Sequence, residues 1–405
     1  MNPDIARLQR QARELLPPAV YDYYAGGSGR ERTLRANERS WRRNWLAPRV
    51  LRDVRAVDTT TRLLGAGLRT PVAVAPTAYQ RLAHPEGELA TAAGAARAGA
   101  LLVLSTRSTR RLEDVAAQVG RAGGTWWLQV YVMRDRDRTI DLVRRAAAAG
   151  AQALVLTADT PVVGRKHRDT SAMELIAADM LANLGPVQDP ADLHQSAGVT
   201  FADIAWLSEV SGGLPVVVKG VLRPDDALAC AAAGAAAVIV SNHGGRQLDG
   251  ALPAAWALPG VAAALAQAPG QVPVYVDGGI RTGEDVLAAI ALGAQAVFVG
   301  RPVLWALACG GADGVADLLS GLTDALAHAM ALAGAPSLPQ VAGIAGVAGV
   351  AGVARARRRV RQARGVRVRG NCQTPLVTSN AHPNRWTGER IHVRISVRGP
   401  AAHPP

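Results

Sequence analysis

The chain has 405 residues, of which 49% are hydrophobic, and its formal net charge is +13. This hydrophobic content is enough for a sizeable core, and the apolar runs, interrupted by glycine or charge, fall short of the roughly 18 to 20 residues that span a bilayer. No basic-then-apolar secretory start is present, and the three cysteines lack metal-ligand spacing. We therefore expect a soluble, cytoplasmic protein with no membrane partner, disulfide framework or zinc site.

The positive charge is concentrated at the C-terminus. Residues 354–405 contain twelve arginines and one glutamate, a charge of +11, which leaves only +2 for residues 1–353. The low-complexity run AGIAGVAGVAGVA precedes these arginines, so residues 336–405 are predicted to form a disordered basic tail. Salt-dependent nucleic-acid binding through this tail is an alternative function. No aromatic interleaving or binding motif supports it, and we expect no nucleic-acid partner.

The predicted fold class is α/β. Residues 1–60 are expected to form an N-terminal helical extension, followed by eight short apolar runs, each with a helix-like segment behind it. Near-continuous apolar strands are typical of sheets buried on both faces, so eight of them favour a parallel (β/α)₈ TIM barrel within one domain over 1–335. A doubly wound sheet is the alternative. The eight runs are 72–75, 101–105, 126–132, 153–157, 215–219, 237–241, 274–277 and 296–300.

One interval between these runs is unusually long. The fourth and fifth runs are separated by near 58 residues, against about 20 to 30 elsewhere. Extra length of this kind lies over the active-site face of a barrel, which predicts a lid over residues 168–200. An ordinary surface insertion is the alternative.

Polar residues follow every predicted strand, where barrels carry their chemistry. The run SNHGGRQLDG, residues 241–250, puts His243 and Arg246 beside two glycines directly after an apolar strand. A histidine can act as a base near neutral pH, and arginine matches the geometry of a carboxylate. Asp159, just beyond the fourth strand, is placed to orient the imidazole, and Arg165 supplies a second guanidinium. We therefore predict a site that removes a proton from a small carboxylate.

Two further patterns indicate an organic, phosphorylated cofactor. The runs DGGIRTG and VGRP follow the seventh and eighth strands, where barrels commonly bind phosphate, and they carry Arg281 and Arg301. Lys219 ends an apolar strand, so its ammonium is expected in the barrel mouth, either to stabilise an anionic ring or to form a Schiff base. No cluster of Asp, Glu and His has metal-site spacing, and we expect no metal.

Together these motifs resemble a known family. The segments YDYYAGG, APTAYQRLAHPEGE, QVYV, TADTP, VVVKG, VSNHGGRQLDG, DGGIR and VGRP stand in the order found in the FMN-dependent 2-hydroxy acid oxidases and dehydrogenases, which include glycolate oxidase, lactate oxidase and mandelate dehydrogenase. The resemblance covers about residues 5–335. Within the family, AGGSG, APTAYQRLAHPEGELA and SNHGGRQLDGA are most similar to the actinobacterial hydroxymandelate oxidases.

The resemblance implies FMN as cofactor and a role for each matching residue. His243 would take the substrate hydroxyl proton while hydride leaves Cα, or would remove the Cα proton first, and Asp159 would stabilise the imidazolium. Arg165 and Arg246 would hold the carboxylate, with Tyr23 and Tyr131 beside it. Lys219 would lie near the flavin, which removes the Schiff-base alternative. The remaining cofactor-binding residues would be Pro76, Thr77, Ala78, Ser105, Gln129, Thr157, Ser241, Asp277, Gly278, Gly279, Arg281, Gly300 and Arg301.

The resemblance also predicts the reaction. An (S)-2-hydroxy acid, mandelate-like, 4-hydroxymandelate-like or lactate-like, would be oxidised to the 2-oxo acid with O₂ reduced to H₂O₂. The alternative is a dehydrogenase that passes the electrons to a quinone or another carrier. Arg107 and Tyr79 stand where plant glycolate oxidases have tryptophan and methionine, which favours a larger or aromatic substrate. Family members are often tetramers, so a homo-oligomer is expected.

Overall fold

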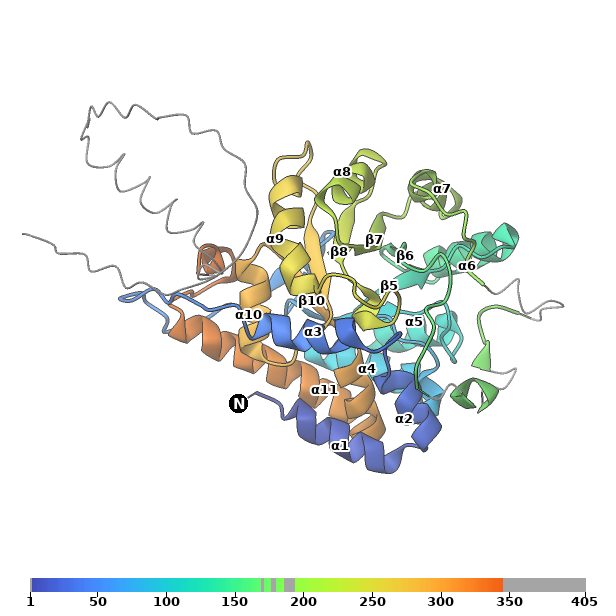
Figure 1. Ribbon diagram of the computed structural model, residues 1–405, viewed down its shortest axis with the longest axis horizontal. Coiled ribbons are helices and arrows are strands. Elements are labelled where there is room, and N and C mark those ends of the chain that lie inside the picture. The colour runs from blue at the N-terminus through green and yellow to red at the C-terminus, as the bar shows by residue number, and fades with distance from the viewer. Residues whose placement is uncertain (1, 169–170, 176–179, 186–193, 345–405) are drawn as a thin grey trace, which may run out of the picture. The chain divides into compact units, whose positions relative to one another are not determined.

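A computed structural model describes residues 2–168, 171–175, 180–185 and 194–344 (Figure 1). Much of the lid predicted over 168–200, and the tail from residue 345 onward, lie outside the described residues. The folded chain continues past the predicted domain boundary at 335, because a short 3₁₀ helix, η6 (Leu338–Val341), follows and Ile344 is fully buried.

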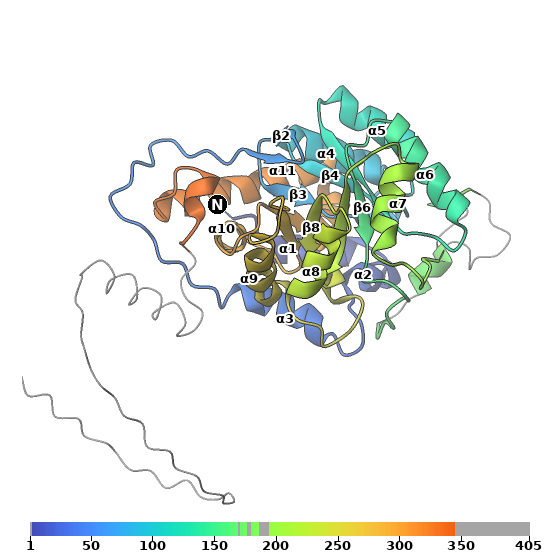
Figure 2. The same cartoon turned by 90° about the horizontal axis from the view of Figure 1, so that it is seen from above.

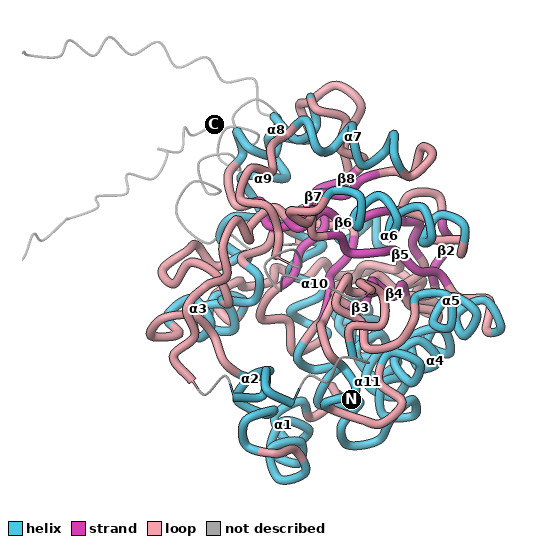
Figure 3. Tube along the Cα trace, turned by 90° about the vertical axis from the view of Figure 1, so that its right-hand side faces the viewer, coloured by secondary structure: helices cyan, strands magenta, loops and turns pink. Residues whose placement is uncertain are grey.

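Eight parallel strands close into a barrel in the order β10-β3-β4-β5-β6-β7-β8-β9. Each of the eight predicted apolar runs forms one of these strands, which confirms the TIM barrel. Figure 3 shows the strands gathered together with helices outside them. Their bounds are β3 (Val72–Val74), β4 (Leu101–Leu104), β5 (Thr125–Val130), β6 (Leu154–Thr157), β7 (Val216–Val221), β8 (Ala237–Val240), β9 (Val274–Asp277) and β10 (Ala296–Val299).

A helix follows each strand and covers the outside of the barrel (Figure 2). Local sequence signals explain two of the helix starts: Pro224 opens one helix, and Thr282 and Asp285 form a capping box at another. The helices are α4 (Glu88–Ala98), α5 (Leu112–Arg121), α6 (Arg136–Ala148), α7 (Ala202–Val210), α8 (Pro224–Ala232), α9 (Ala254–Leu265), α10 (Gly283–Ala291) and α11 (Arg301–Leu332).

The N-terminal extension is helical only in its first part. Helices α1 (Ile5–Leu15), α2 (Pro18–Ala25) and α3 (Arg32–Trp41) form, and α1 packs against α11 (Figure 1). No helix forms between Trp41 and a hairpin that the sequence did not predict, β1 (Thr61–Leu63) paired with β2 (Ala66–Leu68).

The interior of the barrel is packed rather than open. Trp127, Tyr275 and Phe298 meet there with ring centroids 5.9 to 6.3 Å apart, and Leu63 and Leu68 of the hairpin belong to the same buried cluster. The side chains that fill this space leave the chemistry to the carboxyl ends of the strands.

Helix α11 is the one described helix long and apolar enough to cross a membrane by length and composition alone. Half of its most apolar window is buried against the rest of the protein. Gly310 and Gly311 have non-helical backbone angles, so the helix is broken near its first third. Core helices of folded domains give the same pattern, and this one packs against α4 and α1.

Candidate active site

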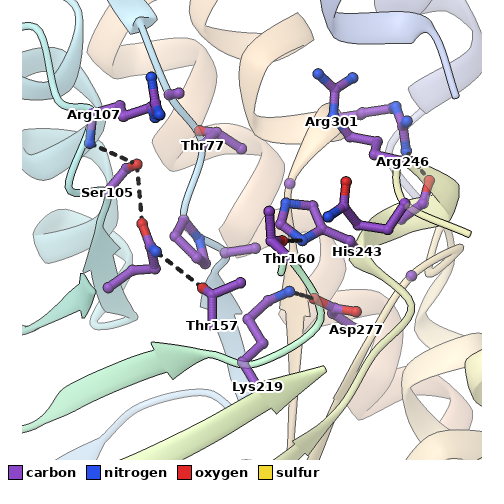
Figure 4. Close-up of a pocket in the computed structure, with 18 of the residues that line it drawn as sticks. Thr77, Ser105, Arg107, Thr157, Thr160, Lys219, His243, Arg246, Asp277 and Arg301 are labelled. Carbon is purple, nitrogen blue, oxygen red and sulfur yellow. Dashed lines mark hydrogen bonds and ion pairs between the residues drawn. The ribbon is translucent and has the colours of Figure 1, made fainter. Parts of the chain in front are cut away.

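A cavity of about 670 Å³ lies at the carboxyl ends of the strands, and all eight strands or the loops after them contribute to its lining. This volume is in the range of cofactor and substrate sites. Figure 4 shows 18 of the residues that line it. The predicted site residues in the lining are Tyr23, Pro76, Thr77, Ala78, Ser105, Gln129, Tyr131, Thr157, Lys219, His243, Arg246, Asp277, Gly278, Gly279, Arg281, Gly300 and Arg301.

His243 and Asp159 form an ion-pair-like contact at one side of the cavity. His243 Nδ1 lies 2.9 Å from Asp159 Oδ1, and the Thr160 hydroxyl lies 3.4 Å from the same nitrogen. Burial would raise the pKa of Asp159, but the neighbouring His243 and Lys219 outweigh it and the pKa is lowered. The ionised Asp159 accepts a hydrogen bond from the Nδ1–H group of His243. The other ring nitrogen, Nε2, then carries the lone pair and can act as a base.

The turn that carries His243 is strained and tightly braced. His243 has φ +57°, a left-handed conformation uncommon for a residue with a side chain. The side chain of Asn242 accepts from Gly245 N at 3.1 Å and exchanges two hydrogen bonds with Asn37 of α3, at 2.9 and 2.7 Å. A Cβ on Gly245 would lie 2.6 Å from Leu34 N, so the glycine lets α3 support the turn.

Lys219 is a buried cation at the end of β7. Its Nζ lies 3.0 Å from Asp277 Oδ2 (Figure 4). The same nitrogen donates to Ser241 Oγ at 2.9 Å. Burial lowers the pKa of Lys219, but the charges of Asp277 and Asp159 overcome this effect and the pKa is raised. The ammonium therefore stays charged. Ser241 also accepts from His243 N at 3.0 Å, so it links the cation to the histidine turn without lining the cavity.

A row of neutral polar groups crosses the strand ends from β4 to β6. Gln129 Nε2 donates to Thr157 Oγ1 at 2.9 Å, and Ser105 Oγ donates to Gln129 Oε1 at 3.2 Å (Figure 4). These bonds fix the orientation of the amide. The row offers donors and acceptors that suit the edge of a heteroaromatic ring.

Arginines dominate the side of the cavity near α2. Arg246 Nη1 donates to Tyr23 O at 2.7 Å, and its guanidinium carbon lies 5.1 Å from the centre of the Tyr23 ring. Arg301 donates to the carbonyls of Tyr24 and Gly244 at 2.9 and 3.0 Å. Burial, with the charges of Arg246 and a third arginine, lowers the pKa of Arg301 to about 9. This clustering of cations favours an anionic ligand.

Tyr131 is the second phenol predicted at the substrate. Burial raises the pKa of Tyr131 to about 12, so its hydroxyl remains a proton donor through the physiological range. Burial likewise raises the pKa of Tyr23. Both phenols are therefore available to donate to a carboxylate.

The structure places Arg165 apart from the other predicted residues. Its side chain is exposed on the loop after β6 and it is not among the residues that line the cavity. Lys166, the next residue, lines the cavity instead and donates to Arg246 O. Burial and the charges of Arg246 and Arg301 lower the pKa of Lys166 to about 7.

Sequence reasoning missed several lining residues. Lys166 had one usable signal, because the chain contains only two lysines and the other, Lys219, also lies in the site. Tyr24 comes from helix α2, and the others come from loops that the fold brings to the mouth of the cavity. Besides Lys166, the missed residues include Tyr24, Arg134, Thr160, Pro161, Val162, Val163, His194, Gln195, Ala197 and Gln247.

Known proteins resemble this chain in sequence and in fold. The profile of the family described as FMN-dependent dehydrogenase matches residues 12–344. The 4-hydroxymandelate oxidase of Amycolatopsis orientalis is 45% identical over 346 residues, 82% of this chain and 95% of the relative. The L-lactate oxidase of a Nostoc species is 44% identical over 350 residues, 82% and 94% of the two chains. Glycolate oxidase 1 of Zea mays is 41% identical over 352 residues, 84% and 94% of the two.

Solved structures give the same result. Mandelate oxidase with (S)-2-phenylpropionate has a TM-score of 0.74 and 44% identity, over 83% of this chain and 96% of that one. Mandelate oxidase with (S)-4-hydroxymandelic acid has a TM-score of 0.74 and 41% identity over the same shares. The fold and the sequence motifs therefore agree on a single group of relatives.

Proposed function

The chain belongs to the FMN-dependent dehydrogenase family and is, within it, an FMN-dependent 2-hydroxy-acid oxidase. From this premise we propose its reaction. The reaction is oxidation of an (S)-2-hydroxy acid of the mandelate type to the 2-oxo acid, with O₂ reduced to H₂O₂. The observation that carries it is the His243–Asp159 pair, which holds a base beside Arg246 in a cavity of cofactor size.

The cavity residues fit FMN. Asp277 Oδ1 is buried and has no hydrogen-bond partner in the described part of the chain, which suits a ribityl hydroxyl. Gly278 and Gly279 line the cavity directly after Asp277 and have φ near +90°, and glycine turns of this kind commonly bind anions through backbone N–H groups. The row from Ser105 to Thr157 would meet the polar edge of the ring. When bound, FMN supplies the acceptor for the two electrons and the hydrogen that leave the substrate.

The proposed substrate binds by its carboxylate to Arg246. A guanidinium can donate two parallel hydrogen bonds to a carboxylate, and the hydroxyls of Tyr23 and Tyr131 would add donors beside it. Arg165 would join this group only if its loop moved inward. The substrate hydroxyl then lies at His243, whose imidazole accepts the proton.

His243 acts as the base because Asp159 fixes its tautomer and lies against the imidazolium that forms when the ring takes a proton. In the first order of events the imidazole takes the hydroxyl proton as hydride leaves Cα; in the alternative order it takes the Cα proton first. Lys219 supplies a preorganised positive charge that stabilises negative charge developing on the cofactor side of the cavity. Its burial keeps water from screening that charge.

An aromatic substrate is favoured by the phenols and by Arg107 in the cavity, and by relatives named as 4-hydroxymandelate and mandelate oxidases. The test is anaerobic titration of the purified protein with (S)-mandelate and (S)-lactate. The yellow flavin should be reduced by (S)-mandelate in the parent and far more slowly in His243→Ala, with flavin absorbance as the control for cofactor content. A protein that takes up no FMN, or whose flavin no 2-hydroxy acid reduces, would contradict the proposal.

The acceptor is tested in the second half-reaction. The oxidase names of the relatives support O₂, and a dehydrogenase that uses a quinone is the alternative. Reduced flavin mixed with air-saturated buffer should reoxidise rapidly and release H₂O₂. Slow reoxidation in air with rapid reoxidation by a soluble quinone would favour the dehydrogenase.

We also propose a cytoplasmic homo-oligomer, as a tetramer, with no membrane or nucleic-acid partner. Light scattering after size exclusion measures the assembly, and a monomer at micromolar concentration would contradict it. Cell fractionation checks the location.

A further inference from the structure

The cavity carries more positive charge than the proposed reaction needs. Two of its cations, Lys219 and Arg281, have carboxylate partners, and Arg246 and Arg301 are assigned to the substrate carboxylate and the cofactor phosphate. Arg107 is assigned neither to the substrate carboxylate nor to the cofactor phosphate. In the part of the chain described, one carboxylate, Asp277, lines the cavity against seven lysine and arginine side chains: Arg107, Arg134, Lys166, Lys219, Arg246, Arg281 and Arg301.

Arg107 is held firmly in the lining. Its Nη1 donates to Tyr79 OH at 2.8 Å, and Tyr79 N donates to Arg107 O at 3.1 Å, so the loops after β3 and β4 are tied together twice. Its guanidinium carbon lies 5.8 Å from the centre of the Tyr131 ring. Figure 4 shows Arg107 on the opposite side of the cavity from His243 and Arg246.

We propose that Arg107 selects 2-hydroxy acids whose side chain ends in a hydrogen-bond-accepting oxygen, and that an ionised oxygen is preferred over a neutral one. The inference rests on the proposed function. Arg246 and His243 fix the carboxylate and the hydroxyl at one side, so a long or aromatic side chain crosses the cavity toward Arg107. A guanidinium has only donors, so a substrate end that carries an oxygen can accept a hydrogen bond from Arg107, and a wholly apolar end cannot.

Tyr79 is the positioning residue for this arginine. Its phenol oxygen accepts from Arg107, and its side chain is buried with the ring 6.2 Å from that of Tyr23. Tyr79 has φ +58°, a second left-handed residue in the lining besides His243. Such strain is typical of positions that a site holds in place.

The experiment compares three substrates that share one end and differ at the other: (S)-mandelate, (S)-4-hydroxymandelate and (S)-4-carboxymandelate. The parent should show the highest kcat/KM for the 4-carboxy acid. Arg107→Met should lower the ratio of kcat/KM for the 4-carboxy acid to that for mandelate by about 10- to 100-fold, as expected for a lost charged hydrogen bond. The 4-hydroxy acid should show a smaller drop in the same direction.

Three controls keep the test specific. Arg121→Met, on the exposed surface of α5, removes the same charge away from the cavity and should leave the ratio unchanged. Arg107→Lys retains a cation and should recover part of the ratio. Calorimetric Kd values for benzoylformate and 4-carboxybenzoylformate should show the same difference without turnover, and Tyr79→Phe should weaken only the second.

The outcomes separate cleanly. Equal loss for all three substrates, or a parent that prefers unsubstituted mandelate, overturns the role of Arg107 and leaves the oxidase proposal standing. A flavin that none of the three reduces contradicts the proposed function itself. If Arg107→Met does not fold, two measurements still test the role of Arg107. They are the ratio of kcat/KM for the 4-carboxy acid to that for mandelate in Arg107→Lys, and the order of kcat/KM for the three substrates in the parent.

Discussion

His243 Nδ1 lies 2.9 Å from Asp159 Oδ1 although β7 separates the strands from which the two residues come. Gly220, at the end of β7, makes this contact possible. A Cβ on Gly220 would lie 2.6 Å from Asp159 Cβ, and the residue has φ +112°. A glycine in the middle strand therefore lets the carboxylate of one neighbour reach the imidazole of the other.

Replacing the carboxylate should slow flavin reduction. Asp159→Asn keeps the shape of the side chain but removes the negative charge beside the imidazolium that forms during the reaction, so the rate should fall by about 100-fold or more. Anaerobic stopped-flow spectroscopy measures it. Asp53→Asn, at an exposed ion pair with Arg55, is the control. A rate within threefold of the parent would show that Asp159 is not needed for the base.

Gly220→Ala should slow flavin reduction in the same way as Asp159→Asn, but to a smaller extent. The new methyl group must displace Asp159, so flavin reduction should slow by about 10-fold or more and the melting temperature should fall. Gly212→Ala is a matched control, because Gly212 also has positive φ, at +80°, but a Cβ added there would meet no other atom within 4 Å. Equal effects of the two changes would mean that backbone strain, and not the contact with Asp159, is responsible.

Lys219 and Asp277 should depend on each other in their effect on the free energy of unfolding. Lys219→Met leaves a buried carboxylate without its cation, which costs about 3–5 kcal/mol in the free energy of unfolding. The double variant Lys219→Met with Asp277→Asn should recover much of this loss. Denaturant unfolding of the parent, of each single variant, Lys219→Met and Asp277→Asn, and of the double variant measures it. Arg97→Met breaks an exposed ion pair with Asp313 and should cost under about 1 kcal/mol; a double variant no better than Lys219→Met would contradict the coupling.

Lys166 should make stability depend on pH. Its pKa of about 7 in the folded chain lies well below the usual 10.4 or so of a lysine, so between about pH 7 and 10 the unfolded chain binds one more proton there. Its contribution to stability therefore rises as pH increases through this window and is least favourable below pH 7.

Lys166→Met tests this in protein freed of FMN. The variant should melt higher than the parent at pH 6 to 7, and the difference should shrink toward pH 10. Differential scanning fluorimetry across this range measures it. Arg62→Met, at an exposed position on β1, should give a difference that does not vary with pH. A constant offset for Lys166→Met would contradict the lowered pKa.

The strands could be predicted because each is a local property of the sequence. A parallel strand covered on both faces must be almost wholly apolar, and runs such as AVIV and LLVL show this directly. The hairpin Thr61–Leu68 could not be predicted in the same way. Each of its two strands is only three residues long, and exposed and buried residues follow one another along it. The hairpin is stable because Leu63 and Leu68 pack into the barrel interior.

The sequence by itself determined which residue types stand at the strand ends, since in a barrel every strand delivers its last residues to one face. The tertiary structure decided which of them meet. It paired His243 with Asp159 across Gly220, tied Arg107 to Tyr79, placed Lys166 in the cavity and left Arg165 exposed. These contacts depend on barrel closure and on loop paths, and two residues 84 positions apart carry no local signal of a 2.9 Å hydrogen bond.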